Sequence, residues 1–331
     1  MDLLTGTPTQ REVADFVSAN KLTRPSATYS TIRIVAFLAA WPLLFLLGGY
    51  LRNPFAWLVI LVAEGFVFEG FSSGIHESGH DKLYTSRRLN YLAGIIMSVP
   101  LLHNFPAHRA THFAHHQHTH DLEKDSEPIY KEMKLYDYLA YMLFSGEGYT
   151  LILYFEGLMA SVGRGPTWAR SRPVRRMCRI STVIVSIELS LLALGIWRAP
   201  GLTVKLFVVP YVIWGSVLSS MVTHPEHEKC DFGPARAFTT TRTTESNRFL
   251  RYFLWYNNYH AAHHLVPSVP GQNLPALQEF IDPYCKHRER SYTRWHLAYI
   301  RTLFSHRGRD SMLTTSFWIS FAKRIDVFGS K

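Results

Sequence analysis

Residues 54–81 read PFAWLVILVAEGFVFEGFSSGIHESGHD, a long apolar run that ends in two histidines four residues apart. Glu64 and Glu69 are the only charged residues between positions 54 and 75. At a rise of about 1.5 Å per residue, a helix of this length crosses a hydrocarbon core of about 30 Å. If the helix continues, His76 and His80 lie on one face and can share a metal ion. The segment therefore predicts a membrane span with a metal site at its foot.

Three more apolar runs complete a pattern of four spans in two hairpins. Each pair is separated only by a short turn with proline, Asn53-Pro54 in the first and Arg198-Ala199-Pro200-Gly201 in the second. Turns this short place consecutive helices side by side and antiparallel. The four predicted spans are residues 31–51, 54–75, 178–197 and 202–222.

The rest of the chain is also predicted to be helical. Residues 91–102 are apolar but too short to cross a bilayer, and 138–160 contain Glu147 and Glu156. We interpret both segments as buried or interfacial helices. The expected fold is an all-α integral membrane protein with a helical cap that holds a histidine-rich site for two metal ions. Its parts are an N-terminal segment 1–30, a membrane domain 31–280 and a tail 281–331.

Composition supports a membrane protein. Of 331 residues, 47% are hydrophobic and only 18% are charged, which excludes a disordered, collagen-like or coiled-coil chain. Three cysteines without a C-x-x-C pair exclude a thiolate metal site and a disulfide framework. Residues 1–30 lack the apolar run of a signal peptide, and Thr9 and Glu12 have the spacing of a capping box, which predicts a short amphipathic helix.

Charge predicts which side of the membrane each segment occupies. In the two-hairpin arrangement both termini and the loop 76–177 share one side. Only Arg52, Arg198 and Lys205, of 35 Lys and Arg residues, fall near the other side. The positive-inside rule makes the crowded side cytoplasmic, and every histidine is on it. The net charge of +10 then indicates attraction to anionic membrane lipids, since no nucleic-acid-binding motif accompanies it.

Histidine is the residue type that predicts chemistry. Fourteen of the 17 histidines lie between His76 and His264. Residues 112–116 and 260–264 both have the spacing H-x-x-H-H, and His224-Pro-Glu-His227 follows the last span. In a helix, neighbouring histidines differ in direction by about 100°, so they can address two ions. Imidazole suits Zn, Cu, Fe and Ni, and this many histidines exceed the needs of one tetrahedral ion.

Two other functions could use histidines in this pattern. His76-Glu77-x-x-His80 matches the pattern of zinc metalloproteases, in which the glutamate is the general base. A membrane zinc protease would leave most of the clustered histidines unused. A metal transporter with a histidine-rich loop would carry polar ligands near the membrane midplane, where Glu188 is the only deep candidate. Metal analysis would separate these functions. One zinc per chain favours the protease, and two irons per chain favour chemistry with O₂.

Three segments resemble the histidine boxes of the membrane fatty acid desaturase family. They are GIHESGHDKLY at 74–84, HFAHHQHTHD at 112–121 and NYHAAHHLVP at 258–267. MVTHPEH at 221–227 is similar to the family segment that supplies a further histidine ligand, usually after a glutamate. The likeness runs from about residue 60 to 280.

The resemblance implies a di-iron centre that uses O₂ to oxidise an unactivated C–H bond of a fatty acyl or related lipid chain. Desaturation is the commonest reaction of the family, with hydroxylation, ketolation and decarboxylation to a terminal alkene as alternatives. Chain length, head group and position of reaction are not readable from the sequence. Carried over position by position, the implied iron ligands are His76, His80, His112, His115, His116, His227, His260, His263 and His264.

Carboxylates are expected to orient these rings by accepting their second N–H, and the nearest acids in sequence are Asp81, Asp121 and Glu226. The chain shows no haem or flavin fingerprint, so a separate ferredoxin, or a cytochrome with its reductase, is expected to supply electrons. Expected non-ligands are His103, His108, His118, His120 and His224, and expected surface residues are His287, His296 and His306.

Overall fold

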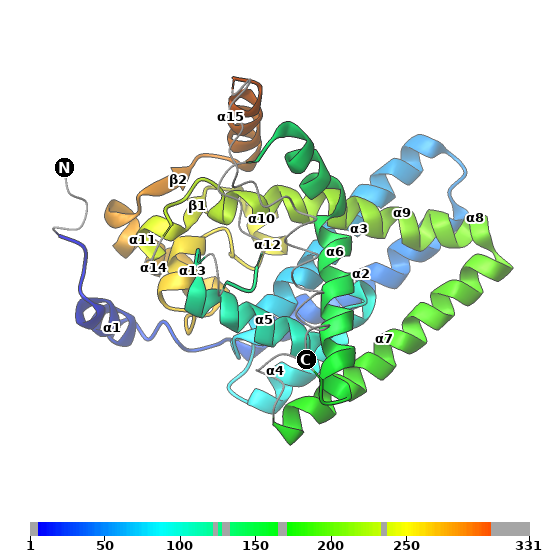
Figure 1. The fold of residues 1–331 in the computed structure, drawn as a ribbon, viewed down its shortest axis with the longest axis horizontal. Coiled ribbons are helices and arrows are strands. Elements are labelled where there is room, and N and C mark those ends of the chain that lie inside the picture. The colour runs from blue at the N-terminus through cyan, green and yellow to red at the C-terminus, as the bar shows by residue number, and fades with distance from the viewer. Residues whose placement is uncertain (1–5, 122–124, 128–132, 165–170, 233–236, 306–331) are drawn as a thin grey trace.

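The computed structural model describes residues 6–121, 125–127, 133–164, 171–232 and 237–305, and most of these residues are helical (Figure 1). The α-helices are α1 (Gln10–Ala19), α2 (Ala27–Tyr50), α3 (Pro54–Gly79), α4 (Arg87–Ser98), α5 (Phe105–His118), α6 (Leu135–Ser161), α7 (Arg172–Arg198), α8 (Pro200–Thr203), α9 (Val209–Ile213), α10 (Ser220–His227), α11 (Ala237–Thr240), α12 (Arg248–Phe253), α13 (His260–Leu265), α14 (Leu274–Ile281) and α15 (Tyr292–Ser305). The shorter elements are η1 (Val99–Leu101), η3 (Val204–Val208), η4 (Trp214–Ser219), η5 (Gly271–Asn273), η6 (Asp282–Tyr284), β1 (Arg242–Thr244) and β2 (His287–Glu289).

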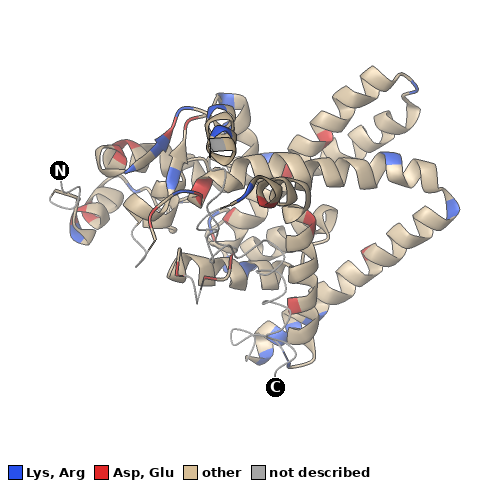
Figure 2. Ribbon diagram, turned by 45° about the horizontal axis from the view of Figure 1, so that its top comes forward, with Lys and Arg blue, Asp and Glu red and all other residues tan. Residues whose placement is uncertain are grey.

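Four helices among the described residues are long and apolar enough to cross a membrane, as the sequence predicts. Figure 2 shows that charged residues are sparse along them. Asn53 begins the second of them, because its side chain accepts hydrogen bonds from the amides of Phe55 and Ala56 at 2.9 and 3.1 Å. Each helix extends beyond at least one predicted limit; the four are Ala27–Tyr50, Pro54–Gly79, Arg172–Arg198 and Pro200–His227.

Pro225 lies inside the last of these helices. Proline has no amide hydrogen, so the carbonyl of Met221, four residues earlier, loses its helical partner. That carbonyl instead accepts a hydrogen bond from Nε2 of His296 at 2.9 Å. A proline inside a helix usually breaks or kinks it. Here α10 nevertheless contains both His224 and His227, because a distant residue satisfies the free carbonyl.

His296 is therefore buried, with 5% of its surface exposed, and the prediction that it lies on the surface is wrong. The hydroxyl of Tyr138 lies 2.9 Å from its Nδ1, so the imidazole links α15 to both α6 and α10. His287 is also partly buried, and its Nε2 lies 3.4 Å from a carboxylate oxygen of Asp231. His306 lies outside the described residues.

The two segments expected to be buried or interfacial helices are α4 and α6. The α4 helix packs on α3, where the Asn90 side chain accepts hydrogen bonds from the amides of Leu83 and Tyr84. The α6 helix is long and lies between α7 and η4. A Cβ at Gly146 would lie 2.5 Å from Cα of Gly215, so the missing side chain permits close contact between backbones.

A smaller unit beside the long helices, on the left of Figure 1, consists of α1 together with α11, α13, α14, β1 and β2. Its core joins α1, α13 and α14 through buried residues such as Val13, Val17, Leu274 and Leu277. The predicted capping box at the start of α1 is present, since Thr9 and Glu12 exchange hydrogen bonds. The strands β1 and β2 pair in parallel. This packing holds α13, which carries the third histidine segment.

Candidate metal centre

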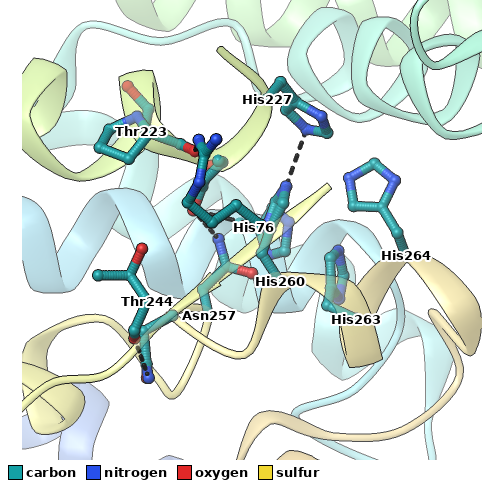
Figure 3. A network of polar contacts seen from close by, with 12 residues as sticks. His76, Thr223, His227, Thr244, Asn257, His260, His263 and His264 are labelled. Atoms are coloured by element: carbon teal, nitrogen blue, oxygen red, sulfur yellow. Dashed lines mark hydrogen bonds and ion pairs between the residues drawn. The ribbon is translucent and has the colours of Figure 1, made fainter. Parts of the chain in front are cut away.

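All nine histidines predicted as ligands meet in one place. They come from the end of α3, from α5, from the end of α10 and from α13, segments that are far apart in sequence. Figure 3 shows the rings of His227, His260, His263 and His264 around one centre together with His76. A fold that gathers side chains from four helices at one point is the arrangement that a shared metal site requires.

The histidines form two groups. In the first ligand group, one nitrogen of each ring lies within 4.8 Å of the others; its members are His76, His80, His112, His116 and His263. The second ligand group meets the same limit and consists of His115, His227 and His264. His260 adjoins the second group, because its Nε2 lies 2.9 Å from Nε2 of His227. Helix α5 contributes to both groups, so two ions would lie on either side of its histidines.

Several ring nitrogens face each other at the spacing that a shared ion produces. Nε2 of His116 lies 2.9 Å from that of His112 and 3.0 Å from that of His263. Nε2 of His115 lies 3.1 Å from that of His227. Two nitrogens bound at right angles to one ion, each at about 2.1 Å, would be about 3.0 Å apart. The geometry therefore fits imidazoles that converge on metal ions.

Unpaired polar atoms make the same point. Both ring nitrogens of His76 and Nε2 of His80 and His264 are buried without a hydrogen-bond partner among the described residues. Leaving such atoms unpaired costs about 1–3 kcal/mol each. A metal ion would satisfy them, and a set of neutral imidazoles suits iron as well as zinc, copper and nickel. The residues present thus fit a pair of metal ions.

The electrostatics favour the neutral, metal-binding form of most rings. Burial, and then the neighbouring imidazoles, lower the pKa of His116, His263 and His264 well below its ordinary value. At pH 7 each of these rings therefore has a lone pair to offer. His115 differs: burial alone would lower its pKa, but Glu127 and Asp125 outweigh burial and raise the pKa to about 9.

Three carboxylates lie against the outer nitrogens of these rings. Oδ1 of Asp125 is 2.9 Å from Nδ1 of His115, and Oε1 of Glu127 is 3.3 Å from Nδ1 of His112. Such contacts fix the tautomer and direct the other nitrogen toward a metal. Glu226, which the sequence predicted for this role, has Oε1 at 3.4 Å from Nδ1 of His260, a contact without the geometry of a hydrogen bond.

Sequence reasoning missed Asp125 and Glu127. They follow the second box in an irregular segment, where no helical period reveals direction, and the only signal was their position a few residues after the box. Of the acids proposed instead, Asp81 forms a two-pronged ion pair with Arg109 at 3.0 and 2.8 Å. The amide of Asp121 donates to the His118 carbonyl at 2.8 Å.

We expect Asp125→Asn to weaken metal binding by about 10- to 100-fold, because an amide no longer accepts the His115 proton as strongly. Metal content measured after dialysis against a graded chelator series checks this. Glu245→Gln is the matched control, since Glu245 is exposed and pairs with Arg288 on the surface. Equal metal retention in Asp125→Asn and Glu245→Gln would show that the carboxylate does not support the site.

The remaining clustered histidines lie outside both ligand groups in the described part of the chain. His103 and His108 line the cavity described below. Nδ1 of His120 lies 2.5 Å from the Asp231 carbonyl. His118 is partly exposed. The ring of His224 packs against Tyr141, with centroids 4.5 Å apart. Their assignment as non-ligands stays a prediction.

A cavity of 220 Å³ adjoins the metal centre. Its wall includes the ligand candidates His76, His112, His115, His227 and His260, and it continues between α3, α5, α6 and the helix of residues 200–227. A molecule in this cavity would touch the rings that are candidate metal ligands. The cavity is thus the natural position for a substrate.

Comparison with known proteins agrees with this architecture. Residues 56–296 match the model of a family described as "Fatty acid desaturase". The chain is 26% identical over 303 residues to "Omega-3 fatty acid desaturase, endoplasmic reticulum" of Vigna radiata var. radiata, covering 81% of this chain and 76% of that protein. It is 22% identical to "sn-1 acyl-lipid omega-3 desaturase (ferredoxin)" of Nostoc sp. (strain 36), covering 78% and 77%. It is 26% identical to "sn-1 oleoyl-lipid 12-desaturase" of Anabaena variabilis, covering 67% and 66%.

Proposed function

Because the chain belongs to the fatty acid desaturase family, and is thus an integral membrane oxidoreductase, we propose that it oxidises an unactivated C–H bond in a fatty acyl or related lipid chain with O₂. Desaturation is the reaction we favour, and the names of the three relatives above describe it. The observation that carries the proposal is the meeting of eight histidines in two groups, with His260 next to the second group, beside a cavity. Such a site serves redox chemistry on a substrate held next to two metal ions.

The metals we propose are two iron ions. The first ligand group would hold one iron, and the second ligand group with His260 would hold the other. When bound, the irons would use O₂ and two electrons to remove hydrogen from the chain. In a desaturation, a CH₂–CH₂ unit, O₂, two electrons and two protons become a CH=CH unit and two waters.

The protein itself would orient the imidazole rings and the substrate chain. Asp125, Glu127 and Glu226 would hold the rings of His115, His112 and His260 in the ligating tautomer. Nδ1 of His227 faces the Thr240 carbonyl at 3.0 Å, which can only accept, so its proton is on Nδ1 and the Nε2 lone pair faces the centre. The cavity would place one segment of the chain against these rings.

The electrons would come from a separate ferredoxin. Two of the matched relatives, from Nostoc and from Synechocystis sp. (strain ATCC 27184 / PCC 6803 / Kazusa), carry "(ferredoxin)" in their names. A cytochrome with its reductase is the alternative donor. The net charge of +10, carried almost entirely outside the far-side turns of the proposed hairpins, would attract an acidic donor and anionic membrane lipids.

For the membrane we propose two hairpins, α2 with α3 and α7 with the helix of residues 200–227, beneath a cytoplasmic cap formed by the other helices. The four apolar helices and the charge distribution support this arrangement. A tag before Met1 and a tag after Lys331 should then both be reached from the cytoplasm in a protease-protection assay. Tags on opposite sides of the membrane would refute the two-hairpin layout.

A zinc protease and a metal transporter are the alternatives outside the family, and the site disfavours the first. Glu77, which would be the protease base, accepts a hydrogen bond from the Gly271 amide at 2.8 Å through one oxygen. Its other oxygen is 3.9 Å from Nδ1 of His76. Glu77 thus holds the segment after α13 through the Gly271 amide. In this role it is not placed to activate a water for attack on a peptide.

Product analysis tests the proposed reaction. The full chain, expressed in a lipid-rich host with ferredoxin and its reductase, should yield lipid chains lighter by two hydrogens in mass spectra. The His263→Ala variant in the same host is the control. Chains that gain one oxygen would instead indicate hydroxylation. Chains that gain one oxygen and lose two hydrogens would indicate ketolation, and terminal alkenes would indicate decarboxylation. An unchanged lipid profile with an iron-loaded enzyme and a competent donor would refute lipid oxidation.

A further inference from the structure

The cavity beside the metal centre is lined mainly by apolar surface, but its wall also contains polar side chains that a simple hydrocarbon chain does not need. Helix α3 presents Glu69, whose two oxygens accept hydrogen bonds from Ser73 at 3.2 Å and from the Trp214 indole at 3.0 Å. His103 and His108, before and within α5, line the same space. Polar side chains at this depth are costly to bury and usually mark function.

Each of the two histidines is anchored through one nitrogen and offers the other. Nε2 of His103 lies 3.0 Å from the Thr150 hydroxyl, and Nδ1 of His108 lies 3.1 Å from the Tyr149 hydroxyl. Nδ1 of His103 and Nε2 of His108 are buried without a partner among the described residues. His103 is 4% exposed, so water outside the protein does not satisfy it. The hydroxyl contacts fix both rings at the cavity wall and leave one nitrogen of each ring without a hydrogen-bond partner among the described residues.

His103 neighbours His108, and His108 neighbours a ligand candidate of the metal centre. The centroid of His103 is 6.3 Å from that of His108, which is 5.9 Å from that of His112, a member of the first ligand group. The rings of His108 and His112 are nearly parallel, at 3°. A group bound to His108 or His103 would therefore lie one or two ring spacings from the metal-binding imidazoles.

The charge of the wall selects a neutral group. The described residues that line the cavity include no lysine or arginine, and they include the acidic residues Glu69, Asp125 and Glu127. A carboxylate or phosphate beside His103 and His108 would find no lysine or arginine to pair with. Burial lowers the pKa of His103 to about 3, so this ring is neutral as well. A neutral imidazole has one donor and one acceptor nitrogen, which suits a group that both donates and accepts hydrogen bonds.

We infer that the substrate chain carries a neutral hydrogen-bonding group, a hydroxyl or an amide, which His103 and His108 hold a short distance from the metal-binding histidines. The inference rests on the proposed function, because it assumes that the cavity takes the substrate. It narrows the substrate class from acyl lipids in general to chains that bear such a group near the oxidised carbon. His103 and His108 are then specificity-determining residues.

Binding to the iron-loaded full chain in nanodiscs tests the inference. The probes are methyl octadecanoate, a series of its monohydroxy derivatives with the hydroxyl at successive carbons, and a chain of equal length with an internal amide. Their dissociation constants come from displacement of a fluorescent fatty acid ester. The best polar chain should bind about tenfold more tightly than methyl octadecanoate, as one net hydrogen bond would produce. A preference for a hydroxyl chain or for the amide chain identifies which of the two groups the substrate carries.

Variants assign the preference to the two histidines. His103→Phe and His108→Phe keep a ring but remove its nitrogens, and each should reduce the tenfold preference to about one, with iron content unchanged. His118→Phe, on the partly exposed side of α5, should keep the preference. Equal affinities of the unmodified protein for plain and polar chains would overturn the inference, and they would mean that the polar side chains of the wall only bind water. This result does not depend on whether a variant folds. A preference that survives in both variants would overturn it too.

Failure of the proposed function would look different. An enzyme that prefers polar chains but oxidises none of them would refute lipid oxidation and leave the binding assignment in place. An enzyme that oxidises plain chains and shows no binding preference would support lipid oxidation and refute the binding assignment.

Discussion

Replacing His263 with Ala should remove metal from the first ligand group and reduce turnover to background. The side chain is 1% exposed, and its Nε2 lies 3.0 Å from Nε2 of His116, so no neighbouring residue or bulk water can take its place. Loss of a carboxylate partner alone costs about 10- to 100-fold in metal affinity, and loss of a ligand should cost more. Iron content of the purified variant and product formation with ferredoxin measure the two effects.

The neighbouring residue and a surface residue provide the comparison. His264 belongs to the second ligand group, so His264→Ala should lower iron at the other position and abolish turnover as well. His118 belongs to neither group in the described part of the chain, and His118→Ala should retain both iron and activity. Full turnover in His263→Ala or His264→Ala would show that the third box does not hold the metals.

His227→Ala should lose iron and activity together. Nε2 of His227 lies 3.1 Å from that of His115 and 2.9 Å from that of His260, which makes it the link between α5 and α13. Its other nitrogen is committed to the Thr240 carbonyl. The assignment of His227 rested on a shorter motif than the three boxes, so this variant tests the weakest step in the ligand set. Iron analysis and product formation measured on the same preparation decide the outcome.

His224→Ala is the matched variant on the same helix. Although the two histidines are three residues apart in α10, the ring of His224 lies among Tyr141, Trp295 and Tyr299, with centroids at 4.5, 5.3 and 5.3 Å. We expect this variant to lose packing free energy and keep most of its iron. The reverse result, with iron lost from His224→Ala and kept in His227→Ala, would mean that the ligand after the fourth span has been misidentified.

The positions of the ligand candidates were predictable because local spacing determines them. A ring at one position of H-x-x-H-H shares a helical face with the ring three or four residues away, whatever the rest of the fold does. Length and hydropathy similarly predict the four apolar helices. The meeting of α3, α5, α10 and α13 at one point does not follow from spacing, and the sequence supported it only through the resemblance to a family.

The features that the sequence did not predict depend on contacts between segments that are far apart in the chain. Asp125 and Glu127 lie in irregular backbone, so only the fold brings them to His115 and His112. His296 looked like a surface residue because nothing near it in sequence predicts a bond to Met221 across 75 positions. The same bond explains why Pro225 does not end α10. In each case the missing information was a long-range partner, which residue type and period do not contain.

The metal content of the purified full chain tests the central claim most directly. Elemental analysis by mass spectrometry, on protein kept in lipid and freed of adventitious metal, should find two irons per chain and no stoichiometric zinc, as two ligand groups of histidine predict. One zinc per chain, with iron absent after growth in iron-rich medium, would contradict the di-iron account and favour the protease alternative.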